Sequence, residues 1–533
     1  MFDRWFDATR WSWCALSGLL LIASFAPFSS PTCGWIALVP VWWVLTRSER
    51  VRQRPFRHGY FIGLIFFGGV FWWICNVTTI GMVFLVLYLA LFPAVWCFLV
   101  VRFIPRQVES THLGILFRAL AAAALWVTLE WWRSWYLTGF NWNELGISQA
   151  PSIIFRQLAA YGGIHLISFI LVTVNILWAE GLLTMAQTLR ERKVVRASFP
   201  FAAALFIIAF AFALGWHHLQ RHRGGEPTRP SLTFACVQPN IPQIVFTGSD
   251  KDFWQMEDDA LDKTEKLTLQ AIATKPDLLV WPEAMIDEGV FQDRQLNEAV
   301  HGICETFGGY FLLGSQDFDI GAGRKLYNCA YLFTPRGEQY QEYRKTHLVV
   351  LGEFLPLGNQ FPWLRRVIGI GMDFTPGPRP ERFVMQKPPL TFAPLICFED
   401  TLPDVTDRAA RLGPDFFVTI TNDGWYQGWC ARWGIRQHLS HAVFRCIEHD
   451  HPMLRCANTG ISCVIDQDGA VTNRFRDASG AETDVGGIFT GTLEFYPHHS
   501  TLYEAWGDWI VLISCLLTVM LGIRFFCQSP RNK

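Results

Sequence analysis

The sequence is poor in charged residues and carries no excess of either sign. Lys, Arg, Asp and Glu make up 17% of the 533 residues, and the formal net charge is -1. Proteins that bind nucleic acid or another acidic polymer through their electrostatic field carry a clear basic excess or patch. The charge balance therefore gives no reason to expect a nucleic-acid partner.

Cysteine pairs spaced for metal or redox chemistry are also missing. Fourteen cysteines are scattered along the chain, several in apolar stretches, and no C-x-x-C pair occurs. This argues against a zinc ribbon and against a redox motif. In HLSHAVFRCIEHDH (His438–His451), His438 and His441 lie one helical turn apart, but the stretch also suits a helix with solvated histidines. We therefore predict no metal site and no cofactor.

Long apolar runs are abundant, and they are confined to two parts of the chain. The hydrophobic fraction is 51%, with 24 tryptophans, and nearly all long apolar runs fall within residues 11–216 and 508–527. The sequence between them resembles an ordinary soluble domain in composition. We expect an N-terminal transmembrane bundle over residues 1–220, a soluble domain over 231–500 and a C-terminal transmembrane helix over 508–527.

Eight stretches are candidate membrane spans, so we predict a bundle of about eight helices. Because a helix needs about 20 apolar residues to cross a bilayer, Cys33–Leu45 is doubtful and Leu120–Trp132 is short unless it extends. No convincing small-residue cleavage site follows the first stretch, so we expect it to be retained. The candidates are Trp11–Phe28, Cys33–Leu45, Tyr60–Cys75, Ile80–Ile104, Leu120–Trp132, Gly163–Met185, Phe199–Trp216 and Trp509–Phe525.

Basic residues predict on which side of the membrane the soluble domain lies. Arginines are dense in RSERVRQRPFRHG (Arg47–Gly59), and basic residues recur over Arg102–Arg118 and Arg190–Arg196, whereas SSPTCG and NVTTIG contain none. By the positive-inside rule the basic loops are cytoplasmic. Five candidate spans separate the first basic loop from residue 217. The soluble domain is therefore expected outside the cytoplasm, and the tail with Arg524, Arg531 and Lys533 inside.

One segment on the outer side does not fit a plain span. LEWWRSWYLTGFNWNELGISQAP (Leu129–Pro151) is dense in tryptophan and contains Glu130, Arg133 and Glu144. It could be an aromatic belt at the membrane surface in which Glu130 and Arg133 pair at i,i+3. Alternatively, it could shape a lipid-facing entrance to the soluble domain.

Within residues 231–500, apolar strand patterns alternate with helical patterns, which favours an α/β layered domain. SCVIDQDGAVTNRF further predicts a hairpin with its turn at Asp468-Gly469. The predicted strands are Leu232–Gln238, Asp277–Trp281, YFLLGS, CAYLFT, FAPLIC and DFFVTIT, and the predicted helices are Asp250–Ala273, Asn297–Phe307, Leu402–Leu412 and Ala431–Glu448.

Three chemically complementary side chains are each expected just past the end of a strand. Glu283 follows a strand in LLVWPEAM, Lys345 lies in EYRKTHLVVLGEFLPLG, and Cys397 ends PLTFAPLIC. Functional residues of layered α/β domains tend to lie just past strand ends. A thiol nucleophile needs a base, and the oxyanion that forms on acyl attack needs a cationic donor. We predict that Glu283, Lys345 and Cys397 meet in one pocket, and that Glu399 faces the same side as Cys397 if the chain stays extended.

The order of these motifs resembles the nitrilase (carbon–nitrogen hydrolase) superfamily and, within it, the membrane-anchored apolipoprotein N-acyltransferase family. The resemblance covers essentially the whole chain. It implies an αββα sandwich on a helical membrane bundle, with the active site facing outward and opening toward the membrane. The matching stretches, in order, are FAPF, EWWRSWYLTGFNWNELGISQ, VQPNIPQ, WPE, YRKTHLVVLGEFLPLG, ICFED, TNDGWY and RCANTGIS.

The resemblance also implies residue roles. Glu283 would be the base, Lys345 the oxyanion stabiliser and Cys397 the nucleophile. Glu353 would orient Lys345 or relay protons. Phe398 and Glu399 would shape the pocket beside the thiol. Many members have Tyr where Phe398 stands, so any role of that hydroxyl is absent here.

The function expected from the resemblance is a ping-pong acyl transfer. The donor would be a membrane phospholipid, the intermediate a Cys397 thioester, and the acceptor the α-amine of diacylglyceryl-cysteine in a lipoprotein. The location would be a bacterial inner membrane, with residues 231–500 in the periplasm. One alternative is a membrane-tethered amidase or nitrilase acting on small amides. Another is a transporter or scaffold with an inactive insert, although all three catalytic residues are present. The oligomeric state is not predicted.

Overall fold

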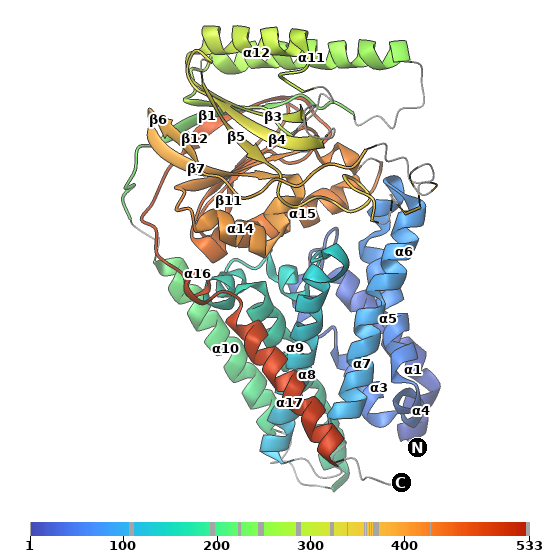
Figure 1. Cartoon of the computed structure of the whole chain (residues 1–533). Coiled ribbons are helices and arrows are strands. Elements are labelled where there is room, and N and C mark those ends of the chain that lie inside the picture. The colour runs from blue at the N-terminus through green and yellow to red at the C-terminus, as the bar shows by residue number, and fades with distance from the viewer. Residues whose placement is uncertain are drawn as a thin grey trace. The chain divides into compact units, whose positions relative to one another are not determined.

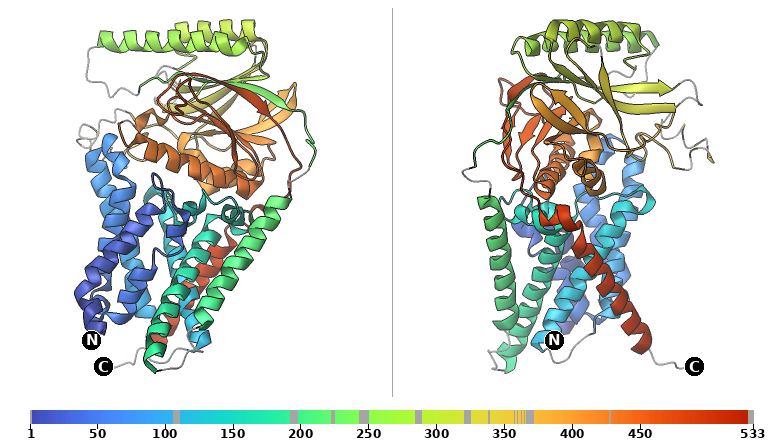
Figure 2. Two further views of the ribbon diagram at one scale, coloured as in Figure 1. Left: turned by 180° about the vertical axis from the view of Figure 1, so that it is seen from behind. Right: turned by 60° about the vertical axis from the view of Figure 1, so that its left-hand side comes forward.

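A computed structural model gives the fold of the chain (Figures 1 and 2). The described residues form two compact units: unit 1 spans 1–221, 428–440 and 500–533, and unit 2 spans 222–427 and 441–499. Of the basic residues used above, Arg106, Arg192, Lys193, Arg196, Arg531 and Lys533 lie outside the described residues. The structure describes residues 2–105, 111–191, 198–221, 225–242, 250–283, 289–319, 325–337, 339–356, 358, 360, 361, 363, 365, 372–426 and 428–528.

Unit 1 is helical. Five of its helical segments are long and apolar enough to cross a membrane, namely Thr79–Phe103, His112–Trp135, Phe155–Ala186, Ser198–Gln220 and Trp509–Cys527. Its helices are α1 (Phe2–Ala23), α2 (Pro31–Gly34), α3 (Val39–Arg47), α4 (Glu49–Gln53), α5 (Pro55–Val70), α6 (Thr79–Leu89), α7 (Leu91–Phe103), α8 (His112–Trp135), α9 (Ala159–Glu191), α10 (Ser198–Gln220), α16 (Leu502–Trp506) and α17 (Trp509–Gln528).

The predicted number of about eight spans is not confirmed, because the described residues contain these five. Cys33–Leu45 does not form one continuous helix: α2 ends at Gly34 and α3 begins at Val39. The nine residues of α3 reach only about 14 Å at the rise of an α-helix. The stretch predicted as Leu120–Trp132 does extend, since α8 begins at His112.

The chain leaves unit 1 and returns to it at the same end of the bundle. The N-terminus, the arginine-bearing α4 and the last turn of α17 lie at one end, and α10 ends and α16 begins at the opposite end (Figure 1). The N-terminal part of the first arginine-rich loop thus lies at the end opposite the one from which residues 222–499 depart.

The hydrogen-bonded i,i+3 pair of Glu130 and Arg133 that the aromatic-belt alternative assumed does not form among the described residues. Glu130 Oε1 accepts a hydrogen bond from the backbone N–H of Leu145 at 2.7 Å. The Arg133 guanidinium carbon instead lies 5.5 Å from the ring centre of Phe67. The two side chains therefore attract each other only electrostatically, without a direct hydrogen bond among the described residues.

Unit 2 contains two six-stranded sheets, ordered β12-β1-β2-β3-β4-β5 and β11-β10-β9-β8-β7-β6. Strands β1, β2 and β3 are mutually parallel, as are β7, β8 and β9. The strands are β1 (Leu232–Gln238), β2 (Leu278–Val280), β3 (Tyr310–Asp319), β4 (Lys325–Phe333), β5 (Tyr340–Arg344), β6 (Phe383–Gln386), β7 (Pro389–Ile396), β8 (Phe416–Thr421), β9 (Met453–Ala457), β10 (Cys463–Ile465), β11 (Val471–Arg474) and β12 (Gly487–Leu493).

Helices cover both outer faces of this pair of sheets, which confirms the predicted αββα sandwich. Figures 1 and 2 show α11 (Asp250–Ile272) and α12 (Arg294–Phe307) on the first sheet, and α14 (Pro403–Ala410) and the part of α15 (Ala431–His449) that belongs to unit 2 on the second. The alternation of side chains along a strand supplies both apolar layers. On β1, Phe234 and Cys236 point into the core between the sheets, whereas Ala235 and Val237 pack in the core under the helices.

Candidate active site

Unit 2 brings Glu283, Lys345 and Cys397 together at the ends of three strands. Glu283 follows β2, Lys345 follows β5 directly, and Cys397 follows β7 directly. The three residues are 6%, 1% and 9% exposed. A buried carboxylate, a buried ammonium and a buried thiol are costly unless each is matched by its neighbours, and here they are.

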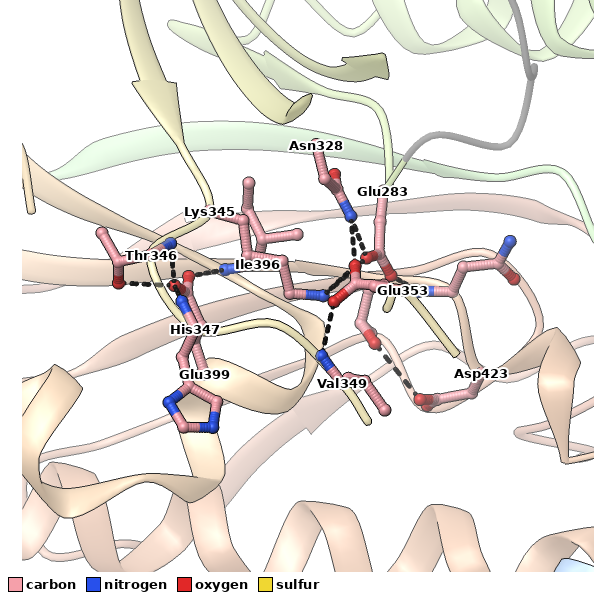
Figure 3. A network of polar contacts seen from close by, with 12 residues as sticks. Glu283, Asn328, Lys345, Thr346, His347, Val349, Glu353, Ile396, Glu399 and Asp423 are labelled. Carbon is pink, nitrogen blue, oxygen red and sulfur yellow. Dashed lines mark hydrogen bonds and ion pairs between the residues drawn. The ribbon is translucent and has the colours of Figure 1, made fainter. Parts of the chain in front are cut away.

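The ammonium of Lys345 lies between two carboxylates (Figure 3). Lys345 Nζ donates to Glu353 Oε1 at 2.7 Å and to Glu283 Oε1 at 3.3 Å. Burial by itself would lower the pKa of Lys345, but the carboxylates of Glu353 and Glu283 outweigh it and hold the pKa well above its ordinary value. An ammonium offers three N–H donors. Described residues take up two of them, which leaves one for an incoming oxyanion.

Glu283 accepts hydrogen bonds from three groups. Its Oε1 accepts from Asn328 Nδ2 at 2.8 Å as well as from Lys345, and its Oε2 accepts from the backbone N–H of Asn422 at 2.9 Å. Asn328 lies on β4, and its backbone carbonyl accepts from the N–H of Lys345 at 2.8 Å. The base candidate is therefore fixed in position by two asparagines that were not predicted from the sequence.

Glu353 lies in position to orient Lys345. Its Oε1 accepts from both Lys345 Nζ and Asn328 Nδ2, the latter at 3.0 Å, and its Oε2 accepts from the backbone N–H of Val349 at 2.7 Å. Asn328 thus donates to both carboxylates that flank the ammonium. Its position in the middle of a buried strand is unusual for an amide and was the only signal in the sequence that could have revealed it.

Cys397 occupies a strained backbone position at the start of a 3₁₀ turn. Its φ is +54°, a left-handed conformation that costs a non-glycine residue about 1–3 kcal/mol. Burial raises the pKa of its thiol well above the ordinary value, Glu283 raises it further, and Lys345 and a hydrogen bond with Thr421 act in the opposite direction. The sulfur is therefore a protonated thiol at neutral pH and needs a base in order to react.

Glu399 does not face the same side as Cys397, so the expectation based on an extended chain is wrong. Residues Cys397–Thr401 form a 3₁₀ turn, which ends the alternation of side chains at Ile396. The carboxylate of Glu399 accepts from the Tyr343 hydroxyl at 2.8 Å. It also accepts from the backbone N–H groups of Thr346 and Ile396 at 2.7 and 2.9 Å (Figure 3). It ties the segment after β5 to the end of β7. Burial raises the pKa of this carboxyl.

Phe398 lies between these groups in sequence and is partly exposed. Its ring centre is 6.0 Å from that of His347. Burial lowers the pKa of His347, so this imidazole is neutral at pH 7. Phe398 thus contributes an aromatic ring beside Cys397 in the chain and no hydroxyl.

A second buried network joins three of the motifs quoted above. The guanidinium of Arg455 pairs with Asp400 at 3.5 Å and with Asp423 at 3.3 Å. A Cβ at Gly460 would lie 1.9 Å from Asp423 Oδ2, so only glycine fits there. Asn458 Nδ2 donates to Asn422 Oδ1 at 3.0 Å. The network fixes the loop whose backbone N–H binds Glu283.

The histidine-rich stretch forms helix α15, but its histidines are not solvated. His438, His441, His449 and His451 are all at least 94% buried, so the alternative of a solvated helix is wrong. Within the described parts of the chain, no group of three potential ligand atoms includes any of these histidines.

One other cluster has metal-ligand chemistry. Single ligand atoms of Asp317, Cys329 and Glu342 lie within 4.8 Å of one another. Arg344 already pairs with this cluster, through Asp317 at 3.0 Å and through Glu342. The two carboxylates therefore have an organic cation as their partner, and the cluster is explained as an ion-pair network over β3, β4 and β5.

Two stacked sheets that offer a thiol, a carboxylate and an ammonium at their strand ends define a nitrilase-like domain. In agreement, the carbon–nitrogen hydrolase family model matches residues 233–484, and the model of the apolipoprotein N-acyltransferase N-terminal domain matches residues 17–177. The two matches together cover most of both units.

Relatives that match nearly the whole chain place it in one family within this class of protein. An apolipoprotein N-acyltransferase of Geobacter metallireducens is 31% identical over 96% of this chain and 94% of its own length. A protein of the same name from Pseudomonas syringae is 29% identical over 96% of this chain and 97% of its own length. Another, from Chlorobaculum tepidum, is 27% identical over 85% of each chain. The chain belongs to the apolipoprotein N-acyltransferase family.

Proposed function

We propose that this protein transfers a fatty acyl chain from a membrane phospholipid, through a thioester on Cys397, to the N-terminal amine of diacylglyceryl-cysteine in lipoproteins. The observation that carries the proposal is the buried cluster of Cys397, Glu283 and Lys345 in a chain with several membrane-length helices. The names of the relatives support lipoprotein N-acylation.

The first half-reaction forms the thioester. The Cys397 thiol gives its proton to the Glu283 carboxylate as the sulfur attacks the ester carbonyl of the donor. The oxyanion that forms takes the remaining donor of Lys345. Collapse of the tetrahedral intermediate breaks the ester C–O bond, and the lysophospholipid leaves with the proton held by Glu283. Acyl-Cys397 and a carboxylate at Glu283 remain.

The second half-reaction forms the amide. The amine nitrogen attacks the thioester carbonyl and gives a proton to Glu283, while Lys345 again stabilises the oxyanion. The C–S bond then breaks, and Glu283 returns the proton to the sulfur. Glu353 and Asn328 hold Lys345 and Glu283 in the same relative position throughout. The enzyme ends each cycle in the state in which it began.

The membrane setting supports a lipid donor and an outward-facing domain. A phospholipid and a lipoprotein anchor both remain in the bilayer, and the chain has helices of membrane-spanning length. Residues 222–499 depart from the end of unit 1 opposite the arginine-bearing α4, and basic loops remain in the cytoplasm. We therefore propose that residues 231–500 are the catalytic domain on the periplasmic side of the inner membrane, and that residues 508–527 anchor it.

The intact mass of the purified protein after incubation with phospholipid alone tests the proposal. We expect the mass of one acyl chain on the protein and one equivalent of released lysophospholipid, because the second substrate is missing. Hydroxylamine, or a diacylglyceryl-cysteine peptide with a free amine, should remove the adduct, whereas a peptide with a blocked amine should not. Continuous release of fatty acid without a trapped adduct would instead identify a hydrolase of the amidase type.

A further inference from the structure

The pairing of strands β7 and β8 places Thr421 next to the Cys397 thiol. The two strands are parallel, and Ile396 lies opposite Ile420, so the residues that follow them, Cys397 and Thr421, lie side by side. Thr421 ends β8 and is fully buried. A hydrogen bond joins its hydroxyl to the thiol. The nucleophile therefore has a polar neighbour that is fixed by the backbone of the adjacent strand.

A buried carboxylate fixes the direction of the Thr421 hydroxyl. Thr421 Oγ1 donates to Asp423 Oδ1 at 3.2 Å. The other oxygen of Asp423 pairs with Arg455 Nη2 at 3.3 Å, and a Cβ at Gly460 would lie 1.9 Å from it. The carboxylate is thus held on both sides, and an ionised carboxylate only accepts hydrogen bonds. The proton of the hydroxyl must therefore point to Asp423.

This direction decides how the hydroxyl and the thiol are bonded at rest. A threonine hydroxyl has one proton and two lone pairs. Its proton is directed to Asp423, so only lone pairs face the sulfur, and the thiol S–H must be the donor to Thr421. The same orientation offers nothing to a thiolate, whose negative charge would face an oxygen lone pair. The resting arrangement thus suits a protonated Cys397, in agreement with its burial.

Charge on the sulfur needs a donor that Lys345 does not supply. Two N–H groups of Lys345 are taken by Glu283 and Glu353, and in the proposed reaction the third binds the oxyanion. Negative charge develops on the sulfur when the C–S bond of the second tetrahedral intermediate breaks. Stabilising a developing charge requires a donor that is already in place. The Thr421 hydroxyl, which is already hydrogen-bonded to the thiol, is such a donor once its proton turns toward the sulfur.

We propose that Thr421 is a further catalytic residue whose hydroxyl changes its hydrogen-bond partner during the reaction. At rest it accepts from the Cys397 S–H and donates to Asp423. As the C–S bond breaks and its electron pair passes to sulfur, the hydroxyl rotates about its C–O bond and donates to the thiolate until Glu283 returns the proton. The hydrogen stays bonded to Thr421 throughout, and Arg455 remains the partner of Asp423. The inference rests on the proposed function, since it concerns the thiolate that leaves the thioester.

Alkylation of Cys397 tests the hydrogen bond without any lipid. The full-length protein in detergent is treated with an uncharged haloacetamide at pH 8, and the alkylated peptides are quantified by mass spectrometry. Thr421→Val removes the hydroxyl at nearly constant volume and should slow alkylation of Cys397 about threefold or more, because the thiolate loses a donor. Thr421→Ala should do the same, whereas Thr421→Ser keeps the hydroxyl and should react within about twofold of the unsubstituted protein.

A threonine on the same strand provides the matched control. Thr419 is also buried on β8, but its hydroxyl donates to Met453 Sδ at 3.3 Å. Thr419→Val should therefore leave the alkylation rate of Cys397 unchanged. An unchanged rate in Thr421→Val, or an equal loss in Thr419→Val or in Thr421→Ser, would overturn the proposal.

The decay of the acyl adduct tests the reaction step itself. Adduct formed with phospholipid alone is mixed with a diacylglyceryl-cysteine peptide, and its loss is followed by intact mass. Thr421→Val should slow this loss at saturating peptide about tenfold or more, the effect of a lost hydrogen bond to a charged group, and should leave the half-saturating peptide concentration unchanged. Thr421→Ser should restore the rate. Loss at the unsubstituted rate in Thr421→Val would overturn the proposal. Absence of the adduct from the unsubstituted protein would instead overturn the proposed function, whatever the alkylation shows.

Discussion

The buried charges around Lys345 in unit 2 are joined by hydrogen bonds, whereas those of Glu130 and Arg133 in unit 1 are not joined to each other. In unit 2, Lys345 lies between Glu283 and Glu353, and each carboxylate has at least one further donor. In unit 1, Glu130 and Arg133 are similarly buried and attract each other electrostatically, but Glu130 Oε2 and Arg133 Nε and Nη2 have no hydrogen-bond partner among the described residues. A buried charge is therefore held by direct hydrogen bonds in the first arrangement and only in part in the second.

The sharpest test of the unit 2 cluster is removal of its thiol. Cys397→Ala should abolish acyl transfer without unfolding the domain, because alanine keeps the Cβ at the strained backbone position. Lipoprotein acylation and thermal unfolding measure the two effects. Cys456→Ala is the matched control, since this thiol is also buried in the second sheet. Normal turnover in Cys397→Ala would remove the nucleophile assignment.

The two arginines of α8 should respond to different degrees to the same substitution. Arg118 donates to Glu180 through Nε at 2.9 Å and through Nη2 at 2.7 Å, so Arg118→Met leaves this carboxylate buried without a cation and should lower the free energy of unfolding by about 3–5 kcal/mol. Arg133→Met removes a guanidinium whose Nε and Nη2 make no hydrogen bond among the described residues, so it should cost clearly less. Thermal unfolding in detergent measures both. Comparable destabilisation by the two substitutions would show that Arg133 has a structural partner.

Lys345 should matter more for rate than for folding. Lys345→Ala should reduce kcat/KM about 10²–10³-fold, the scale of a lost oxyanion donor. It should also lower the melting temperature, since Glu283 and Glu353 then face each other. The double variant Lys345→Ala, Glu353→Gln should restore part of the stability and none of the rate. A loss below tenfold would make Lys345 a positioning residue.

Asn328 should contribute to the reaction rate through its hydrogen bonds to the carboxylates of Glu283 and Glu353. Asn328→Ala leaves Glu283 and Glu353 with one donor fewer each, a change worth about 1–3 kcal/mol. We expect a fall in kcat with little change in KM, because the substrate-binding surface is intact. Asn297→Ala is the control, since Asn297 bonds only the backbone of Val290 among the described residues. A rise in KM at constant kcat would contradict this role.

The smallest expected effect is the change in the reactivity of the Cys397 thiol as the pH is varied. Because the pKa of Cys397 is raised, the thiolate is scarce at pH 7 and its fraction rises as the pH increases toward that pKa. Alkylation of Cys397 by an uncharged haloacetamide should therefore still be accelerating above pH 9. The exposed Cys527 is an internal control. A rate that is already constant between pH 7 and 9 would show that Cys397 is a thiolate at rest.

The local pattern of apolar and turn residues correctly predicted the strands of unit 2 that are apolar along most of their length. LTFACVQ gave β1 with the observed bounds, and Asp468-Gly469 gave the turn between β10 and β11, where Gly469 has a φ of +72°. Strands β5, β6, β9 and β12 were missed. In β5 and β9, YQEYR and MLRCA, charged side chains interrupt the apolar pattern, and Arg455 of β9 is buried only through its partners across the sheet, which a local pattern cannot show.

The sequence predicted only those residues of the site that lie at strand ends, because such ends meet at one edge of the sheets. Glu283, Lys345 and Cys397 follow strands and lie together, while their catalytic roles stay a prediction. Asn328 was missed because it lies inside a strand, and the backbone N–H of Asn422 carries no side-chain signal. The direction of Glu399 was wrong because the chain turns into a 3₁₀ helix after Ile396.

If residues 231–500 lie in the periplasm, as proposed above, the burial of their cysteines has a consequence for how the protein must fold. All fourteen cysteines are described by the structure, and none forms a disulfide. In an oxidising compartment a thiol survives only if it is shielded and protonated. Burial raises the pKa of Cys304 to about 11 and that of Cys463 to about 12. The folded core thus shields these thiols, so a chain with the proposed periplasmic domain must fold before oxidants reach them. The thiols meant are the eight buried cysteines between residues 231 and 500, namely Cys236, Cys304, Cys329, Cys397, Cys430, Cys446, Cys456 and Cys463.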